Sequence, residues 1–416
     1  MCFPPGIRGA WQRLLAWRQQ YRDVRYSRRL VTGAAHDIVL FGATGFTGGL
    51  TAEYLAEHAP AGTRLALAGR NREKLEAVRA RLDGAYGEMP LLHADVDDAA
   101  SLRDMAESAR VVISTVGPYI LYGEPLVAAC AEAGTHYADL TGEPEFVDRM
   151  WLRYHDKAQR SGAKLVHCCG FDSIPHDLGA FYTVQQLPED VPLRVSGFVR
   201  VGGTMSGGTY QSAINAFARI RQAAHTASER RRLEPRPENR RIKGIVRMPH
   251  KDAEAGGWVV PLPTIDPQIV LRSARALPRY GPDFGYGHFL VQKRLAMLAG
   301  LAGGAGAAIA LAQLPPTRRL LLSLKSPGEG PTLERREKAW FRVRFVGEGG
   351  GERVVTEVSG GDPGYGDTAK MLGESALCLA HDELPDLSGQ LTTAFAMGQP
   401  LVDRLQRAGI RFRVAG

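Results

Sequence analysis

The stretch Asp37-Ile38-Val39-Leu40-Phe41-Gly42-Ala43-Thr44-Gly45-Phe46-Thr47-Gly48 decides the fold class of this chain. Its apolar run predicts a buried parallel strand, and the three glycines followed by a helical pattern predict a sharp turn into a helix. In such a turn the first glycine permits the bend, the second lets the backbone approach a pyrophosphate, and the third lets the helix pack close to the strand. The helix N-terminus then offers free N–H groups and a partial positive charge to phosphates. The candidate cofactor-binding residues here are Gly42, Thr44, Gly45, Phe46, Thr47 and Gly48.

The end of the next apolar run indicates which dinucleotide binds. Residues 64–68 are followed by Gly69-Arg70-Asn71. A site for NAD usually places an acid at this strand end to accept hydrogen bonds from the ribose hydroxyls. Arg70 stands there instead, and a guanidinium suits a 2′-phosphate that a carboxylate would repel. The alternative is that Arg70 is only a solvated residue at a helix start, with Asn71 as the helix cap. Together with the glycine turn, Arg70 and Asn71 favour NADP(H).

The pattern downstream of residue 36 alternates between strand and helix. Strands are predicted near 38–42, 65–69, 89–93, 111–116, 135–139 and 164–169, with helices between them. This alternation predicts an α/β fold of the Rossmann type, a doubly wound parallel sheet with helices on both faces. Beyond residue 186, alternation over 193–201 and a hairpin predicted at 340–358 indicate a second α+β domain that contains an antiparallel sheet.

The length of 416 residues exceeds what one core usually supports. We therefore expect four segments: a basic leader (1–35), either disordered or an interfacial helix; the NADP-binding domain (36–186); a second α+β domain (187–360); and a final segment (361–416). In the final segment we expect a helix that returns to the first domain, followed by a tail.

The charge and cysteine pattern exclude several classes of function. The net charge is +8, but residues 1–30 hold seven arginines against one acid, so much of the excess lies in the leader. No module of basic and aromatic residues is visible in the rest of the chain, and we expect no nucleic-acid partner. The five cysteines show no paired spacing, which favours a reducing cytoplasm and predicts no metal site.

Two segments bear on membranes. The leader carries tryptophans and leucines among its arginines, and residues 295–314 contain no charge. The second segment has the length of a bilayer span, yet its many glycines and alanines make a buried or membrane-dipping helical hairpin the favoured interpretation. We expect a cytoplasmic protein, either free in the cytoplasm or bound peripherally to the inner face of the plasma membrane.

Polar residues follow the predicted strands at the edge where a cofactor would lie. Asp95 follows the third strand, where a carboxylate either meets the adenine amino group or caps the next helix. Thr115, Gly117 and Pro118 follow the fourth strand, where the nicotinamide half of the cofactor lies in this architecture. The candidate catalytic residues are Tyr119, Tyr122 and Asp172: either phenol can donate a proton, whereas Asp172 is either a catalytic acid or a helix cap. His176, one turn into the helix after Asp172, is interpreted as structural.

A missing motif separates this chain from a common enzyme class. Short-chain dehydrogenases carry a Tyr-x-x-x-Lys pair in which the lysine lowers the phenol pKa. No tyrosine of this sequence has a lysine four residues later. The short-chain mechanism is therefore disfavoured despite the similar glycine turn.

Several motifs together resemble those of the saccharopine dehydrogenase-like oxidoreductases. They comprise the glycine turn, Ala68-Gly69-Arg70, Val116-Gly117-Pro118-Tyr119, Tyr137-Ala138-Asp139-Leu140-Thr141-Gly142-Glu143, Gly170-Phe171-Asp172-Ser173-Ile174-Pro175 and Asp362-Pro363-Gly364-Tyr365-Gly366. The resemblance covers about residues 36–381 and leaves the leader outside. Within that family the chain is similar to the mycobacterial trans-acting enoyl reductases and to eukaryotic lipid-droplet relatives. The resemblance implies an NADP-binding Rossmann domain, a mixed α+β second domain, and a role in lipid or glycolipid assembly.

Three functions are compatible with these observations. The favoured one is an NADPH-dependent reductase that transfers a hydride to an enoyl or other lipid-linked acyl substrate. The second is a membrane- or lipid-associated protein that binds NADP(H) without turnover. The third is an amino-acid C–N oxidoreductase of the saccharopine dehydrogenase type, which would need convergent basic residues in the second domain. A homodimer is a compatible assembly for each.

Overall fold

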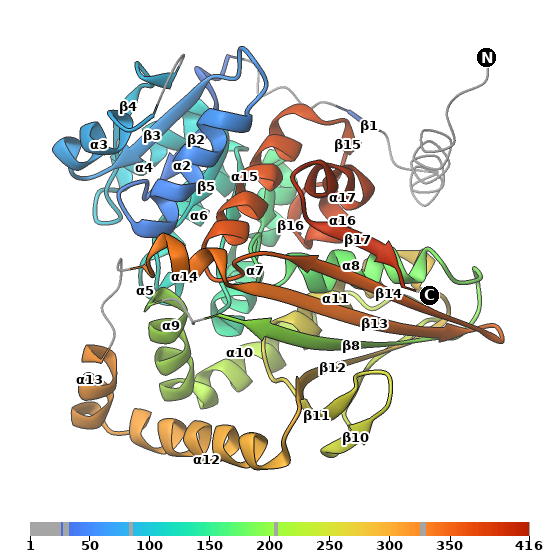
Figure 1. Ribbon diagram of the computed structural model, residues 1–416. Coiled ribbons are helices and arrows are strands. Elements are labelled where there is room, and N and C mark those ends of the chain that lie inside the picture. Colours follow the sequence, from blue (N-terminus) through green and yellow to red (C-terminus); the bar gives the residue numbers. More distant parts are fainter. Residues whose placement is uncertain (1–25, 28–32, 83–85, 204–206, 325–329, 416) are drawn as a thin grey trace.

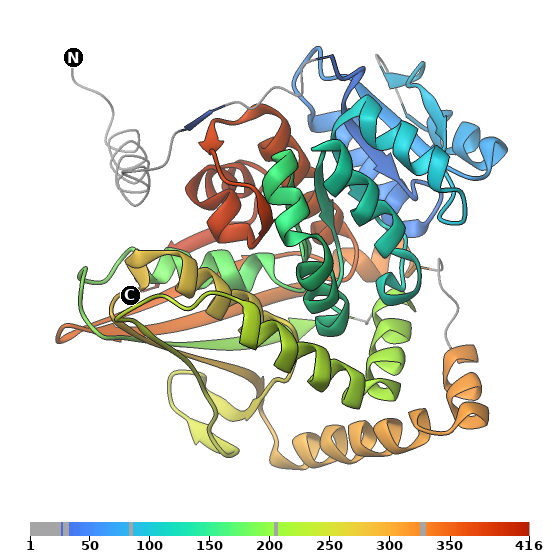
Figure 2. The same cartoon turned by 180° about the vertical axis from the view of Figure 1, so that it is seen from behind.

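A computed structural model describes residues 26–27, 33–82, 86–203, 207–324 and 330–415 (Figure 1). The chain forms two sheets that lie side by side, with helices around and between them (Figures 1 and 2). The predicted leader falls largely outside the described residues. Its part Tyr26–Ser27 forms strand β1, which pairs with β15 (Leu384–Pro385) and is therefore neither disordered nor helical.

The first sheet has seven strands, and every neighbouring pair is parallel. Its order is β16 (Gly389–Leu391), β7 (Lys164–Val166), β6 (His136–Asp139), β5 (Ala109–Ser114), β2 (His36–Phe41), β3 (Leu65–Gly69) and β4 (Leu91–His93). The central strands read as unbroken apolar runs because both faces of the sheet are covered by helices. The predicted doubly wound parallel sheet is confirmed.

Alternate residues of β2 enter two different cores. Ile38 and Leu40 pack under α2 (Phe46–His58), α3 (Arg72–Arg79) and α15 (Gly366–His381). Val39 and Phe41 pack with residues of α4 (Ala99–Ser108), α6 (Glu124–Ala133) and α7 (Pro144–Ser161) on the other face. Since side chains of a strand alternate between faces, this division is what a sheet between two helical layers requires.

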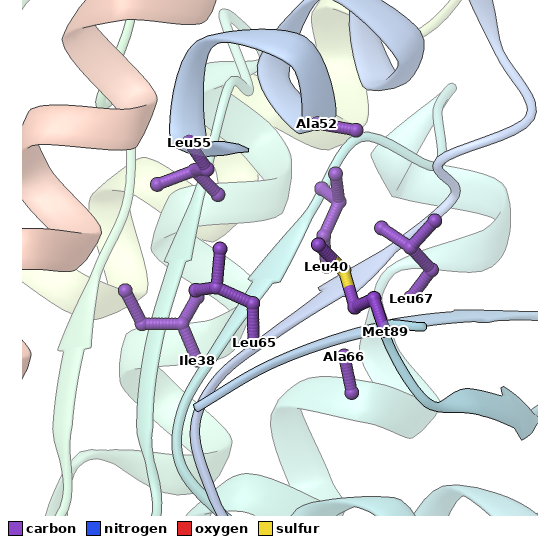
Figure 3. Close-up of a pocket in the computed structure, with 8 residues that line it drawn as sticks. All are labelled: Ile38, Leu40, Ala52, Leu55, Leu65, Ala66, Leu67 and Met89. Atoms are coloured by element: carbon purple, nitrogen blue, oxygen red, sulfur yellow. The ribbon is translucent and has the colours of Figure 1, made fainter. Parts of the chain in front are cut away.

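A small pocket lies inside the first of these cores, between β2, β3 and α2 (Figure 3). It is lined by Ile38, Leu40, Ala52, Leu55, Leu65, Ala66, Leu67 and Met89. All eight side chains are apolar, so the pocket offers no group that could orient a polar ligand. We interpret it as a packing gap and place the candidate site elsewhere.

The second sheet is mixed and has eight strands. Its order is β10 (His250–Asp252), β11 (Gly257–Pro261), β12 (Asp283–Gln292), β8 (Leu193–Gly202), β13 (Trp340–Gly349), β14 (Glu352–Gly360) and β17 (Arg411–Val414), and β9 (Arg241–Ile245) also pairs with β12. The predicted hairpin is present as β13 and β14. Strand β8 pairs antiparallel with β13, as expected, but parallel with β12, because α10 and α11 lie between β8 and β12 in the chain.

Helix α8 (Ile174–Val184) joins the two sheets. It follows β7 of the parallel sheet and packs on β13 and β14 of the mixed sheet. Its glycine at position 179 lies against Phe345 so closely that an added Cβ would sit 2.3 Å from that ring. Residues of both sheets and of α8 consequently belong to one continuous hydrophobic core.

The remaining helices comprise the short α5 after β5 of the parallel sheet and those of the second half of the chain. They are α5 (Tyr119–Tyr122), α9 (Gly207–Ala218), α10 (Ile220–Leu233), α11 (Asp266–Ala276), the 3-10 helix η2 (Pro278–Tyr280), α12 (Leu295–Ala312), α13 (Pro315–Ser323), α14 (Leu333–Glu337), α16 (Thr393–Ala396) and α17 (Gly398–Arg407). The segment after β14 crosses between the sheets: α15 packs on α2, β16 extends the parallel sheet, and β17 extends the mixed one. The sequence predicted only the helix and a tail here.

The uncharged segment 295–314 forms a helix that is exposed along much of its length. Helices α12 and α13 lie at one end of the molecule, with α9 between them and the parallel sheet (Figure 1). Exposed apolar side chains on this pair are Leu295, Met297, Leu311, Leu314, Leu320 and Leu324. The alternative of a buried hairpin is therefore wrong. Within the described ranges, none of the helices combines the length and apolar character that crossing a membrane demands.

Candidate cofactor and active site

The glycine turn joins β2 to α2 with the geometry that a dinucleotide site needs. Gly42 has a φ of +90°, in the left-handed region that glycine adopts without strain. A Cβ on Gly48 would lie 2.2 Å from the carbonyl oxygen of Gly42, so only glycine lets the helix start this close to the strand. Gly45 is exposed, and the nearest atom to its added Cβ would be 3.5 Å away, which leaves its backbone open to a ligand.

The N-terminus of α2 suits a phosphate electrostatically. Its N-cap residue Gly45 makes no side-chain cap, and the first turn contains no acidic residue. The first-turn amides of a helix have no carbonyl partner within it and are therefore free to bind a phosphate. The Phe46 ring packs edge-on against Tyr365 at 4.8 Å between centroids, and Thr47 accepts a bond from the Thr51 hydroxyl through its carbonyl oxygen. The turn is thus braced by the Asp362–Gly366 segment.

Arg70 and Asn71 occupy the end of β3. Arg70 is exposed and forms no ion pair within the part of the chain that the structure describes, so its guanidinium is available to a 2′-phosphate. Arg72 instead pairs with Glu76 at 3.0 Å. Asn71 caps α3, because its side chain accepts a hydrogen bond from the Lys74 amide at 2.8 Å. Its contact with the cofactor stays a prediction.

Two further predicted cofactor residues lie along the same edge of the sheet. Asp95 accepts a hydrogen bond from the Asp97 amide, while the cap of α4 is Asp98. The helix-capping alternative for Asp95 is therefore wrong, and its contact with adenine stays a prediction. The Thr115 hydroxyl donates to the carbonyl oxygen of Gly42 at 3.0 Å, which fixes the end of β5 against the glycine turn.

The residues after β5 divide into a buried and an exposed tyrosine. Gly117 and Pro118 lead into α5, where the Tyr119 hydroxyl donates to the Ser114 carbonyl at 2.9 Å and accepts from the Leu140 amide at 3.2 Å. Burial raises the pKa of Tyr119 well above its usual value. Because this hydroxyl is fully engaged in holding two loops together, the geometry favours a structural role for Tyr119. Tyr122 is 44% exposed and stays a candidate.

Glu143 organises the edge of the sheet from a buried position. Its carboxylate accepts hydrogen bonds from the amides of Tyr119 and Ile120, both at 2.9 Å, and from the Ser212 hydroxyl of α9 at 2.7 Å. Burial raises the pKa of Glu143 despite these bonds. This residue ties the α5 loop to the second half of the molecule, and we assign it a positioning role.

Asp172 differs from Glu143 because its carboxyl group has no partner. It forms no hydrogen bond or ion pair with any residue that the structure describes, and it is only half-buried by surface area. A Cβ on Gly142 would lie 3.2 Å from its Cγ atom, so the carboxyl faces the loop after β6. Burial, with Asp266 and Glu143 nearby, raises its pKa to about 7. Asp172 is therefore the one predicted catalytic residue that can hold and release a proton near neutral pH. Its capping alternative is wrong, since Ser173 is the N-cap of α8.

Three residues of this edge were missed by sequence reasoning: Ser212, Asp266 and Tyr365. Tyr365 belongs to one of the motifs on which the family resemblance rests, and that motif could have indicated that Tyr365 lies at the site. Ser212 and Asp266 lie in the second half of the chain without a motif around them. Only the fold brings them to the parallel sheet.

The residues present fit NADPH. Side chains at Gly42 and Gly48 would fill the space that the pyrophosphate needs. The first turn of α2 contains no acidic residue that would repel a phosphate. At the end of β3, the exposed guanidinium of Arg70 can meet the 2′-phosphate. The fold and this site together define an NADP-dependent oxidoreductase with a Rossmann-type domain.

Comparison with known proteins identifies the family. Residues 38–166 match the family described as "saccharopine dehydrogenase NADP binding domain". The chain is 36% identical over 407 residues to the trans-acting enoyl reductase of Mycobacterium ulcerans, covering 90% of this chain and 96% of that protein. The trans-acting enoyl reductase of Mycobacterium bovis is 36% identical over 409 residues with the same shares. This chain therefore belongs to the saccharopine dehydrogenase-like oxidoreductases, in the group that contains the trans-acting enoyl reductases.

Solved structures agree on the fold. The apo saccharopine dehydrogenase (L-Glu forming) of Saccharomyces cerevisiae aligns with a TM-score of 0.50 at 12% identity, covering 92% of this chain and all of that one. The predicted family, fold class, cofactor and enzyme class are thus confirmed, and the protein is an NADP-dependent reductase. The individual site residues stay predictions.

Proposed function

We propose that this reductase saturates the carbon–carbon double bond of an enoyl group carried on a lipid-linked or thioester-linked acyl chain. Two observations support the substrate class. The relatives that span nearly the whole chain are named for enoyl reduction. In addition, Asp172 offers a half-buried carboxyl group that has no partner among the described residues and a pKa raised to about 7. The second observation carries the proposal, because reduction of a conjugated double bond needs one proton donor besides the hydride.

The residues divide the chemistry as follows. NADPH, when bound, supplies the hydride to the β carbon of the enoyl group. The protonated Asp172 carboxyl group then gives its proton to the α carbon, which completes the saturated chain and leaves a carboxylate that regains a proton from water. Glu143 holds the α5 loop through the Tyr119 and Ile120 amides, and the Gly42–Gly48 turn and Arg70 hold the dinucleotide.

The amino-acid alternative is disfavoured by the charges of the second domain. A dicarboxylate amino acid needs free arginines, yet those that converge there are paired: Arg230 with Asp148 at 2.6 Å, and Arg272 with Glu234 at 2.8 Å. Arg219 is likewise paired with Glu145. The edge of the sheet itself gathers Asp139, Glu143, Asp172 and Asp266, and these groups would repel a carboxylate.

An exposed apolar surface on the far side of α9 from the site supports a lipid-linked substrate. We name it the α12–α13 surface, comprising Leu295, Met297, Leu311, Leu314, Leu320 and Leu324. Lys293 and Arg294 precede it and Arg318 and Arg319 lie on α13, so cationic groups border an apolar surface, as on proteins that rest on anionic membranes. We propose that this surface contacts the bilayer peripherally.

Helix α9 connects that surface to the catalytic edge. At the edge, Ser212 bonds Glu143. At the surface, the Tyr210 hydroxyl donates to the Leu321 carbonyl at 3.0 Å, and the Gln313 amide donates to the Phe217 carbonyl at 2.7 Å. An acyl chain that leaves a membrane at α12–α13 would therefore have one helix to follow to Asp172.

A substrate panel tests the proposed function. We expect the full chain to oxidise NADPH with a long-chain enoyl thioester and to yield the saturated acyl product, measured by absorbance loss and mass spectrometry. The controls are the matching saturated thioester, a 2-oxo acid with ammonia, and a 3-oxoacyl thioester. Turnover with the oxo acid and ammonia but not with the enoyl thioester would contradict the proposal and favour C–N chemistry.

A further inference from the structure

A buried group of two histidines and one aspartate lies beyond the reductase residues. His176 comes from α8, Asp266 opens α11, and His288 lies in β12; all three are buried. The Nε2 atom of His176 lies 3.7 Å from Oδ1 of Asp266, and Nε2 of His288 lies 3.4 Å from Oδ2. One donor atom from each residue lies within 4.8 Å of the other two.

These separations are too long for good hydrogen bonds and suit a shared cation. Nitrogen–oxygen hydrogen bonds in proteins run about 2.7–3.2 Å. Two ligand atoms at about 2.0–2.1 Å from a tetrahedral zinc ion are about 3.3–3.4 Å apart. Among the described residues, Nε2 of His288, the atom that faces Asp266, finds no hydrogen-bond partner, which is costly for a buried polar atom. In His176 the buried atom without a partner is Nδ1, whereas Nε2 is the atom that faces Asp266. Both rings nevertheless converge on one carboxylate.

A second histidine–aspartate pair in the same molecule shows the contrast. Nδ1 of His167 lies 2.6 Å from Oδ2 of Asp139, and Oδ1 of Asp139 accepts the amides of Thr141 and Cys168. The carboxylate of that pair is satisfied by short hydrogen bonds, although Nε2 of His167 finds no partner among the described residues. In the His176–Asp266–His288 group, the histidine nitrogens instead stay 3.7 Å and 3.4 Å from the carboxylate oxygens.

Hydroxyl groups around the three residues contact their side chains, as the outer groups around metal ligands usually do. The Tyr286 hydroxyl lies 3.1 Å from Nδ1 of His288, which orients that ring. The Thr264 hydroxyl donates to Oδ2 of Asp266, which orients that carboxylate. Such outer contacts fix the direction of ligand side chains and leave the remaining lone pairs for the ion.

We propose that His176, Asp266 and His288 bind one divalent first-row transition metal ion of the Zn²⁺ kind, with a fourth position left for water. Two imidazoles and one carboxylate suit such ions, whereas Mg²⁺ and Ca²⁺ prefer oxygen ligands throughout. The proposal revises the prediction of no metal site. It does not depend on the substrate class, because the ion joins α8 to α11 and β12 and so fastens the parallel sheet to the mixed one.

Metal titration of the purified full chain tests the site. After dialysis against a chelator, we expect wild-type protein to bind one equivalent of Co²⁺ with a visible d–d absorption band, and Zn²⁺ to displace it. His288→Gln and Asp266→Asn should each weaken binding at least about tenfold. His250→Gln is the matched control, since His250 faces Asp252 at 3.8 Å near the surface, and it should bind as the wild type does.

Two measurements on the wild-type protein test the site even if a variant does not fold. Zn²⁺ in excess should raise the Tm of chelator-treated wild type by a few degrees, because only the folded chain presents the three ligands together. X-ray absorption at the zinc edge should show two imidazoles and no sulfur. Less than half an equivalent of bound Co²⁺, a sulfur ligand, or equal affinity in folded His288→Gln would overturn the site.

Discussion

The cofactor half and the substrate half of this molecule assemble their polar groups in different ways. In the cofactor half, the glycine turn and Arg70 lie within one β–α–β unit, Gly42 to Arg70, that presents them at one sheet edge. In the substrate half, Asp172, Ser212 and Asp266 come from three elements that meet only because α8 and α9 bridge the sheets. We infer from this difference that the proposed dinucleotide site is encoded locally, whereas the proposed chemistry would depend on how the two sheets are joined.

If the halves divide binding from chemistry in this way, Asp172→Asn should have the largest effect. We expect kcat to fall about 10²–10⁴-fold, the usual contribution of a positioned acid, while NADPH affinity is unchanged. Stopped-flow kinetics with an enoyl thioester and fluorescence titration of NADPH measure the two quantities. Glu143→Gln is the control: it should lower Tm more than Asp172→Asn does, since it disturbs three hydrogen bonds. Equal losses of kcat and of NADPH affinity in Asp172→Asn would contradict the division.

The pH profile of the same step follows from the raised pKa of Asp172. In chelator-treated protein, burial and the neighbouring acids Asp266 and Glu143 raise that pKa to about 7, so the carboxyl group carries its proton below that pH and loses it above. We expect kcat to be highest below pH 7 and to fall as pH rises through this value. The decline should vanish in Asp172→Asn. A wild-type rate that rises through pH 7 would argue for a general base instead.

A charge reversal at Arg70 should have the next largest effect, confined to the cofactor half. Arg70→Glu replaces attraction for the 2′-phosphate with repulsion, and we expect the preference for NADPH over NADH to fall about 100-fold. Arg72→Gln is the control, because Arg72 already pairs with Glu76 and should leave the preference unchanged. Isothermal titration with both cofactors measures the ratio, and a wild type that binds both equally would disprove the assignment of Arg70.

Crowding of the glycine turn should weaken binding of both cofactors. In Gly48→Ala the new methyl group would lie 2.2 Å from the Gly42 carbonyl oxygen, and overpacking of about 1–3 kcal/mol should reduce NADPH affinity about 10- to 100-fold. Gly49→Ala is the matched control in the same helix, since its methyl group would lie 3.1 Å from the movable end of Arg81 and in ordinary contact, 3.8 Å, with the Ala43 carbonyl oxygen. Affinity that is unchanged in folded Gly48→Ala would show that the turn tolerates a shift.

The smallest effect should come from the α12–α13 surface. Leu320→Ser combined with Leu324→Ser removes two exposed apolar groups, and we expect several-fold weaker binding to vesicles that contain anionic lipid. Tm and NADPH affinity should not change. Leu333→Ser, at an equally exposed leucine of α14, serves as the control. Flotation with vesicles measures the binding of each variant. Equal loss of binding in Leu333→Ser would show non-specific hydrophobic adsorption rather than a role of the α12–α13 surface.

Sequence patterns predicted the parallel sheet well because each strand is a local apolar run followed by a glycine or a polar residue. They placed Arg70 directly after β3 and Asp172 in the loop after β7, where the direction of a parallel strand indicates the edge of the sheet, and the roles of both residues stay predictions. Tyr119 shows the limit: its position is right, but only tertiary contacts reveal that its hydroxyl is engaged by Ser114 and Leu140. The pairing of β8 with β12 was likewise beyond reach, since it follows from the intervening helices.

The crossing segment after β14 has a consequence for the order in which the protein can be made. The parallel sheet begins at β2, yet its edge strand β16 and its covering helix α15 are synthesised after the whole mixed sheet. A nascent chain that has left the ribosome only as far as α8 therefore lacks α15, which packs on α2 and β5, and keeps only part of the cover of its first core. Unlike a Rossmann domain that folds as soon as it emerges, this one can close only when nearly all of the chain has been translated. Ribosome stalling between α8 and α15 should accordingly yield chains that bind chaperones rather than NADPH.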